Sequence, residues 1–232
     1  MIETVKNAWK IPELRKKLVF VLFAIVVFRF GHAIYVPFVD TASLATQFAT
    51  ISGGNLLGYF NTLSGGGLAT ASIFALSIYP YINSSIIIQL LQVAIPALER
   101  LAKDGGEEGK KKLQRITRYT TLALAIIMAF SYYLMLKSFG TVLTRTGTWS
   151  AIVIIATFVA GSMVVMWLGD QITEKGIGNG ISIILLVGIV SSGFSALTSI
   201  ISGLQSGTMQ WWAVSIILAL GVGSIAFIIY TT

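Results

Sequence analysis

The sequence predicts an all-α protein that crosses a membrane several times as a polytopic helical bundle. Of its 232 residues, 55% are hydrophobic and 11% are charged, and the mean hydropathy is +0.84. Soluble domains average about 25% charged residues, so this chain has too few charges to give a soluble fold a polar shell. No charged residue lies between residues 41 and 98 or after Lys175. Runs of this length are sufficient for membrane spans, which need about 20 residues each.

Six apolar segments separated by polar breaks are the predicted spans. They cover residues 18–36, 73–95, 116–137, 149–168, 180–201 and 211–230. The first contains Arg29 and lacks a small-residue cleavage site, which indicates a retained span and not a cleaved signal. Residues 2–17, ahead of it, mix basic side chains with Trp9, Ile11 and Leu14, and we expect them to form a short helix on an anionic membrane surface.

The basic residues predict how the spans are oriented. Five precede the first span, seven lie between the second and third, and Lys175 lies between the fourth and fifth. If the spans alternate, these segments share one side, which the positive-inside bias makes the cytoplasm, so both ends of the chain are expected there. The same bias accounts for the net charge of +7, which could otherwise suggest a nucleic-acid partner. We expect no direct contact with nucleic acid.

The segment between the first two spans does not fit a simple hairpin. Residues 55–74, NLLGYFNTLSGGGLATASIF, are apolar enough to enter the membrane but too short and too rich in glycine to cross it before the second span. Non-helical backbone at membrane depth is stable only against protein or a water-filled cavity. We therefore expect a re-entrant half-helix over residues 56–64, a break at the following glycines, and a cavity that holds them.

Two polar breaks later in the chain have distinct patterns. Residues 99–118 form the only sizeable polar loop, and Gly105, Gly106 and Gly109 favour its mobility. Residues 169–180, GDQITEKGIGNG, predict a tight turn before a helix, in which Asn179 or Ser182 can accept hydrogen bonds from exposed amides.

The glycine-rich stretches invite a nucleotide-binding interpretation, which the residues around them disfavour. SGGG at 64–67 could form a phosphate nest, but the P-loop lysine is missing from the LAT that follows. GIGNG at 176–180 lacks the spacing of a dinucleotide fingerprint, and no apolar strand precedes it. Both are better explained as structural breaks, and we expect no cofactor.

Few side chains in the predicted spans can carry chemistry. His32 is the only histidine and the chain has no cysteine, so no metal site is expected and His32 is assigned a structural role. Arg29 lies near the outer end of the first span, where reaching the headgroups or a partner across the bundle explains it as well as a substrate role does. The scarcity of ionisable groups in the spans argues against proton-coupled transport and intramembrane proteolysis.

Four branched apolar residues have helical spacing at the starts of two spans. Ile78 and Ile82 lie four residues apart, and Ile181 and Leu185 repeat that spacing, so each pair is expected to share a helix face. The spacing alone is also typical of ordinary packing positions.

Longer motifs resemble the SecY family, the central subunit of the bacterial protein-conducting channel. They are KKLVFVLFAIVVFRFG (16–31), FNTLSGGGLATASIFALSIYPYINSSIIIQLL (60–91) and MWLGDQITEKGIGNGISII (166–184). The resemblance covers essentially the whole of residues 1–232 as one channel region. It implies an inverted-repeat fold of ten helices in two halves, of which this chain resembles the first half and the sixth helix. Half of the lateral gate and the main binding loops for the ribosome and SecA would then lie beyond it.

The resemblance also implies roles for individual residues. Ile78, Ile82, Ile181 and Leu185 match positions of the pore ring, with Leu185 standing where the family often has isoleucine. The half-helix and glycine break match the plug, with candidate residues Leu57, Phe60, Leu63, Gly65, Gly66 and Gly67. One wall of the lateral gate is implied for Asn83, Ile86, Ile87 and Gln89, with the helix at 116–137 as its neighbour.

The function implied is a channel subunit in the bacterial cytoplasmic membrane that lets secretory polypeptides cross and membrane proteins enter the bilayer. Its implied partners are SecE- and SecG-type subunits, the SecA ATPase or a ribosome, the translocating polypeptide with its signal sequence, and lipid. Two alternatives stay open. The chain could be a scaffold half-channel that needs a separate C-terminal half, or a secondary transporter, since transporters also use broken helices and inverted repeats.

Overall fold

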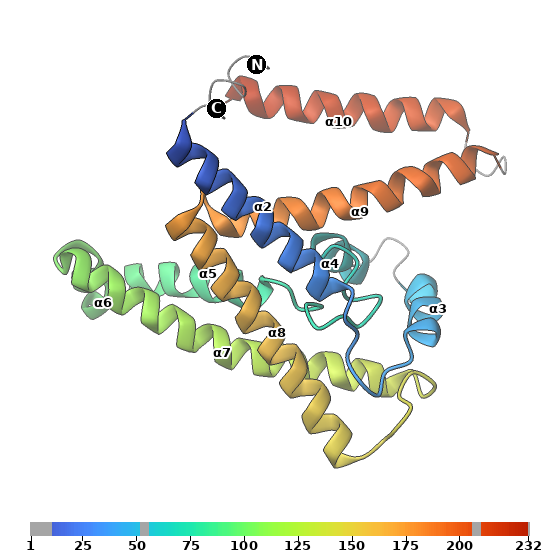
Figure 1. Ribbon diagram of the computed structural model, residues 1–232, viewed down its shortest axis with the longest axis horizontal. Coiled ribbons are helices and arrows are strands. Elements are labelled where there is room, and N and C mark those ends of the chain that lie inside the picture. Colours follow the sequence, from blue (N-terminus) through green and yellow to red (C-terminus); the bar gives the residue numbers. More distant parts are fainter. Residues whose placement is uncertain (1–10, 52–55, 206–209, 232) are drawn as a thin grey trace. The chain divides into compact units, whose positions relative to one another are not determined.

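A computed structural model describes residues 11–51, 56–205 and 210–231, and within them the fold is α-helical. Figure 1 shows the helices in chain order. They are α2 (Pro12–His32), α3 (Thr41–Ile51), α4 (Leu56–Leu63), α5 (Tyr79–Ala94), α6 (Pro96–Lys103), α7 (Gly106–Ser138), α8 (Thr148–Lys175), α9 (Gly180–Gln205) and α10 (Trp211–Thr231). Each of the six predicted spans overlaps one of these helices, and α4 confirms the predicted short helix.

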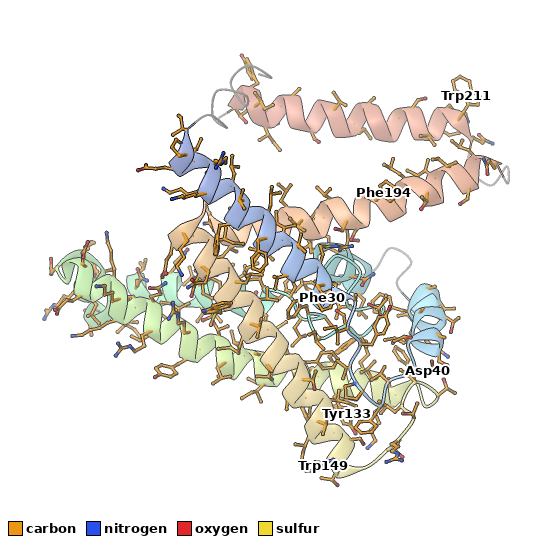
Figure 2. The ribbon with its side chains drawn as sticks, in the orientation of Figure 1. Phe30, Asp40, Tyr133, Trp149, Phe194 and Trp211 are labelled. Carbon is orange, nitrogen blue, oxygen red and sulfur yellow. The ribbon has the colours of Figure 1, made fainter. Side chains whose placement is uncertain are left out.

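The chain divides into two compact units, Met1–Ile189 and Val190–Thr232. In the first, α7 packs against α5 and α8, and α2 packs against α8. The second holds the rest of α9 and α10, whose large apolar side chains are mostly exposed, as Phe194 and Trp211 illustrate (Figure 2). Long helices with bare apolar faces are typical of segments that lie in lipid or against further protein.

Three described helices are long and apolar enough to cross a membrane: α7, α8 and Val214–Thr231 of α10. A fourth candidate is the pair α5 and α6, which a bend of 103° separates. The other predicted spans are helical but less uniform. The described apolar stretch of α9 ends at Phe194, and α2 carries a basic run at its start and Arg29 near its end.

The second predicted span is wrong at its start. Residues 73–78 were expected to be helical, but α5 begins at Tyr79, and residues 64–78 form a buried series of turns that we call the turn segment. Two of its non-glycine residues have left-handed backbone, Ala71 at φ 46° and Ser77 at φ 48°. An L-amino acid in this conformation interrupts an α-helix, so the helix can begin only after Ser77, with Pro80 in its first turn.

The polar loop at residues 99–118 is also more ordered than expected. Helix α6 occupies its first part and α7 begins at Gly106, so most of the loop is helical. Gly109 lies inside α7 and is buried, and a β-carbon there would come within 2.1 Å of the Leu101 carbonyl oxygen. This glycine therefore permits close packing of α6 on α7 instead of mobility.

Helix α3 was not predicted, and its start has a capping signal. The Asp40 carboxylate accepts hydrogen bonds from the Ala42 amide, at 3.1 Å, and from the Ser43 hydroxyl. These hydrogen bonds hold the pKa of the Asp40 carboxyl below its usual range, and the bond from the Ser43 hydroxyl contributes most. The Asp40 amide donates to the Val142 carbonyl at 2.8 Å, which ties α3 to the loop before α8. Of the interfacial helix expected over residues 2–17, residues 1–10 lie outside the described residues, and helix α2 begins at Pro12.

The larger core of the first unit surrounds the turn segment. It joins side chains of α3, the turn segment, α7 and α8, including Leu44, Ala75, Leu136 and Phe158. Tyr132 of α7 stacks edge to face on Phe158, with ring centroids 5.0 Å apart. Its hydroxyl donates a hydrogen bond to the Leu68 carbonyl, so an aromatic side chain of the core satisfies a buried carbonyl of the turn segment.

Replacing Ser77 with glycine should stabilise the protein. Ser77 is 1% exposed, its backbone is left-handed, and its hydroxyl has no hydrogen-bond partner among the described residues. Glycine removes the strain of a left-handed backbone and the cost of the buried, unpaired hydroxyl. Together these gains should exceed the entropy that a more flexible unfolded chain adds, for a net stabilisation of roughly 1 kcal/mol. The measurement is the midpoint of thermal unfolding in detergent. Ser77→Ala keeps the β-carbon and should recover only part of the gain; a lower midpoint for both variants would contradict this account.

Replacing Gly161 with alanine should destabilise it. A β-carbon at this position of α8 would lie 1.8 Å from the Ile73 carbonyl oxygen, so α8 must move away from the turn segment. We expect a loss of about 1–3 kcal/mol, as for other overpacked sites. Gly193→Ala is the matched control, because nothing lies within 4 Å of its added carbon. Equal unfolding midpoints for the two alanine variants would rule out the close contact.

Candidate functional site

The four predicted pore residues meet in one apolar cluster of the first unit. Its buried members come from α2, the turn segment, α8 and α9, and we call it the Ile78 cluster. They are Ala24, Phe28, Phe74, Ile78, Val165, Leu168, Ile172 and Ile184. Ile82, Ile181 and Leu185 are partly buried and pack against it. The structure thus brings together side chains more than 100 residues apart in the sequence, although their role in a pore stays a prediction.

Gly169 of α8 marks the point at which these side chains converge. A β-carbon built there would lie 3.3 Å from Ile78 Cδ1, 3.4 Å from Ile184 Cδ1 and 3.8 Å from Ile181 Cγ1. Ile78 is only 1% exposed, whereas Ile82, Ile181 and Leu185 keep part of their surface open. The structure therefore encloses Ile78 and leaves part of the other three side chains exposed.

The expected helical relation between Ile78 and Ile82 needs a small correction. Ile78 is the residue before α5 and not a member of it, with φ −97° and ψ 4°. The Ile82 amide nevertheless donates to the Ile78 carbonyl at 3.1 Å, which closes the first turn. The two side chains keep the four-residue spacing that places them on one side.

The predicted plug helix α4 lies beside the start of α5. Phe60 stacks edge to face on Tyr79, with ring centroids 5.1 Å apart, and the Tyr79 hydroxyl donates to the Phe60 carbonyl at 3.1 Å. Leu57 packs against the larger core. A pocket of about 260 Å³ lies between α4, the turn segment and α7, lined by Leu57, Phe60, Leu68, Ala75, Leu76, Tyr79, Met128, Ser131, Tyr132 and Met135. The pocket lies beside α4, and the cavity expected to hold the re-entrant segment stays a prediction.

Residues 64–67, the serine and three glycines that follow α4, form a turn that we call the hinge, and Asn61 organises it. The Asn61 carbonyl accepts the Gly66 amide at 2.8 Å, and its side-chain oxygen accepts the Ala69 amide at 2.9 Å. Gly65 and Gly66 have φ values of 72° and 88°, which favour glycine because it has no β-carbon. The break predicted at the glycines is therefore confirmed.

The same hydrogen bonds explain why SGGG is a poor phosphate site. The amides of residues 64–66 donate to carbonyl oxygens of α4 at 2.8–3.1 Å, so they do not point freely at a ligand. Within the described residues, no group of three or more histidine, cysteine, aspartate or glutamate side chains could hold a metal ion.

The hinge also rests directly on α9, close to the Ile78 cluster. A β-carbon at Gly188 would lie 2.5 Å from the Leu63 carbonyl oxygen, and one at Gly65 would lie 3.3 Å from the Gly188 Cα. Gly188 follows Leu185 by less than one helical turn. The end of α4 is therefore adjacent to the predicted constriction, and only the lack of a side chain at Gly188 permits this approach.

The predicted gate residues lie on the open side of α5. Asn83, Ile86, Ile87 and Gln89 are all exposed, whereas Ser84 and Ile88 are buried. On the buried side, the Ser84 hydroxyl donates to the Thr117 carbonyl of α7 at 2.8 Å. Hydrogen bonds of this kind join helices inside membranes. They confirm that α7 is the neighbour of α5 and leave the predicted gate face uncovered within the described residues.

Two features of the site were not anticipated. Arg118 of α7 and Asp170 near the end of α8 form an ion pair at 2.7 Å, which joins these helices. His32, for which only a structural role was predicted, contacts the hinge: its Nε2 lies 2.6 Å from the Ser64 carbonyl oxygen. The turn predicted over residues 169–180 is too long, because α8 continues to Lys175 and only residues 176–179 connect it to α9. The predicted cap is confirmed, since Asn179 Oδ1 accepts the Ile181 amide at 3.0 Å. No local pattern links His32 to Ser64, so sequence alone offered no signal for this contact.

Solved channel structures share the fold. A structure described as a protein conducting channel matches with a TM-score of 0.59 at 16% identity, over 83% of this chain and 42% of the other. Sec61 in the canine ribosome–channel complex from the endoplasmic reticulum matches with a TM-score of 0.58, also at 16% identity, over the same shares. At this level of identity the likeness establishes the fold alone.

Sequence comparisons point to one family. The SecY family model matches residues 72–232. Proteins named protein translocase subunit SecY are similar to this chain: that of Rickettsia conorii is 42% identical over 202 residues, which are 85% of this chain and 46% of the relative. That of Escherichia coli K12 is 40% identical over 222 residues, 94% of this chain and 49% of the relative. The chain spans about half the length of these relatives, and the extent of the match shows that it belongs to the SecY family.

Proposed function

We propose that this chain forms the N-terminal part of a channel through which unfolded polypeptides cross the bacterial cytoplasmic membrane and membrane proteins enter it. The observation that carries the proposal is the position of α4. Its glycine hinge rests on Gly188 of α9, next to the pore candidate Leu185, and its Phe60 rests on Tyr79, next to Ile78. A short helix seated beside a ring of branched apolar side chains has the parts required of a closed constriction.

The proposed chemistry is exclusion and not bond making. Ile78, Ile82, Ile181 and Leu185 would form a gasket whose apolar surface dewets a narrow opening and blocks ions. Such a surface yields to an extended polypeptide without reading its sequence. Residues 57–67 would act as the plug, and the open face of α5 with Asn83, Ile86, Ile87 and Gln89 would release apolar segments into lipid.

The proposed assembly follows from the part of the family that this chain covers. Helices equivalent to the second half would complete the ring, with SecE- and SecG-type subunits around it. A SecA-type ATPase or a ribosome would supply the driving force at the basic side. With both ends at that side, Lys110, Lys111, Lys112 and Arg115, which are exposed at the start of α7, would lie in the cytoplasm.

Cross-linking tests the path of the polypeptide. These 232 residues contain no cysteine, so with a cysteine-free C-terminal half a single introduced cysteine reports unambiguously. Ile82→Cys and Ile181→Cys, in a channel completed by a co-expressed C-terminal half, should each cross-link to a stalled secretory chain. Val164→Cys is the control, because that side chain is 44% exposed on α8 but is not among the pore candidates. Cross-linking that is equal at all three positions would contradict a central path.

Ion leak tests the gasket. In the completed channel, Ile78→Ser with Ile82→Ser should raise the resting conductance, because hydroxyl groups hydrate a constriction that isoleucine keeps dry. The matched control is Ile127→Ser with Ile152→Ser, two exposed residues of α7 and α8 outside the cluster. An unchanged conductance in the first pair, with normal assembly, would remove these residues from the gasket.

Reconstitution tests whether this chain needs the remaining helices. If residues 1–232 work only with the remaining helices, vesicles that contain this chain alone should show no SecA-driven translocation. Translocation should then return when the C-terminal half is added. Transport of a small solute by the chain alone would instead favour the secondary transporter.

A further inference from the structure

We propose that His32 is a proton-responsive latch for the plug, so that acidification holds the glycine hinge more tightly in the closed position. The inference rests on the proposed function of α4 as a plug. It starts from an arrangement around one side chain: both nitrogens of the His32 ring face backbone carbonyl oxygens. Nε2 lies 2.6 Å from the Ser64 oxygen at the end of α4, and Nδ1 lies 3.1 Å from the Phe28 oxygen of its own helix.

A neutral imidazole cannot satisfy both of these acceptors. It carries one N–H, while its other nitrogen presents a lone pair. With the proton on Nε2, the ring donates to Ser64 and its Nδ1 lone pair faces the Phe28 oxygen. With the proton on Nδ1, the contact to Ser64 brings two acceptors together. Only the imidazolium donates to both carbonyls, and its charge strengthens each bond.

The ring is held so that it cannot turn away from the hinge. It packs edge to face on Phe28 and Phe74, at centroid distances of 4.5 and 5.8 Å. Gly67 of the hinge closes the remaining side, since a β-carbon there would lie 3.2 Å from His32 Nε2 and 2.8 Å from Ser72 Oγ. The nearby Ser72 hydroxyl is buried and has no hydrogen-bond partner among the described residues.

The electrostatic surroundings of the ring are simple. Burial of the ring is the largest effect that opposes a second proton, the carbonyl oxygens of Phe28 and Ser64 favour it, and the charge of Arg29 on the same helix opposes it. Arg29 also reaches the hinge, because its Nη1 lies 3.6 Å from the β-carbon position of Gly65. The turn segment presents carbonyl and hydroxyl groups to the ring, and the C-terminal end of α2 favours positive charge. A titration of the His32 ring measures the sum of these effects.

The latch would act on the channel through the hinge. Ser64 precedes the two glycines at which the backbone turns, and the hinge rests against Gly188 of α9. A stronger bond from His32 to the Ser64 carbonyl therefore opposes the movement that lifts α4 from its seat. A gain similar to one net hydrogen bond corresponds to about a fivefold lower population of the unplugged state.

The first test is spectroscopic and uses the chain as it is. Because His32 is the only histidine, nitrogen-15 labelling of histidine gives signals from this ring alone. Between about pH 7.5 and pH 5.5, the range in which histidine usually titrates, the spectrum should change from one protonated nitrogen to two. A ring that stays neutral throughout this range would overturn the proposal.

The second test measures function in the completed channel. Resting ion conductance should fall about fivefold when the outer side is acidified over the same range. In His32→Gln, whose amide can donate to Ser64 but gains no proton, conductance should not depend on pH. Asp40→Asn is the control for other groups on that side, and it should keep the response of the native protein. A native channel without the response, or His32→Gln with it, would refute the latch.

A separate variant keeps the latch and the plug distinguishable. Deletion of residues 57–63 removes α4 and should raise the conductance at every pH if this helix is the plug. A deletion without effect would refute the plug itself. A deletion that raises conductance, in a protein whose native form shows no pH response, would refute the latch alone.

Discussion

The fold depends on satisfying the polar backbone of the turn segment, which is buried but not helical. Inside a membrane an unpaired amide or carbonyl costs several kcal/mol, so such a stretch survives only where neighbouring groups pair with it. Here the partners come from every side. The Ile73 amide donates to the Ile34 carbonyl at 3.0 Å, and the Val36 amide donates to the Ala71 carbonyl at 3.0 Å. The Tyr132 hydroxyl pairs with the Leu68 carbonyl, and the His32 ring pairs with the Ser64 carbonyl.

This requirement explains why small residues occupy the neighbouring helices. Helices α8 and α9 must come close enough to enclose the turn segment and the hinge, and a side chain would hold them away. Gly161 faces the Ile73 carbonyl and Gly188 faces the Leu63 carbonyl, each at a distance that excludes a β-carbon. Close approach through glycine is a common means of packing helices in membranes. The same contacts bring the predicted pore residues of α9 next to the end of α4.

The proposed plug, gasket and latch are therefore parts of one local structure. A movement of α4 would have to release Phe60 from Tyr79 and the hinge from Gly188 and His32. Each contact is small, which suits a segment that must leave its seat and return. The buried residues of the Ile78 cluster come from four other elements, and none belongs to α4.

The sequence by itself determined the features that depend on local composition. Apolar runs predicted the helices, the glycines after Leu63 predicted the break, and Asn179 predicted a cap, because length, backbone freedom and side-chain hydrogen bonding are local properties. The family motifs also brought Ile78 and Ile181 into consideration together. By contrast, the extra turns before Tyr79, the helical form of residues 99–118 and the contact of His32 with Ser64 were decided by the tertiary structure. Each of these features depends on a contact with a residue distant along the chain or on a hydrogen bond to a backbone group. Contacts of these kinds leave no periodic pattern in the sequence.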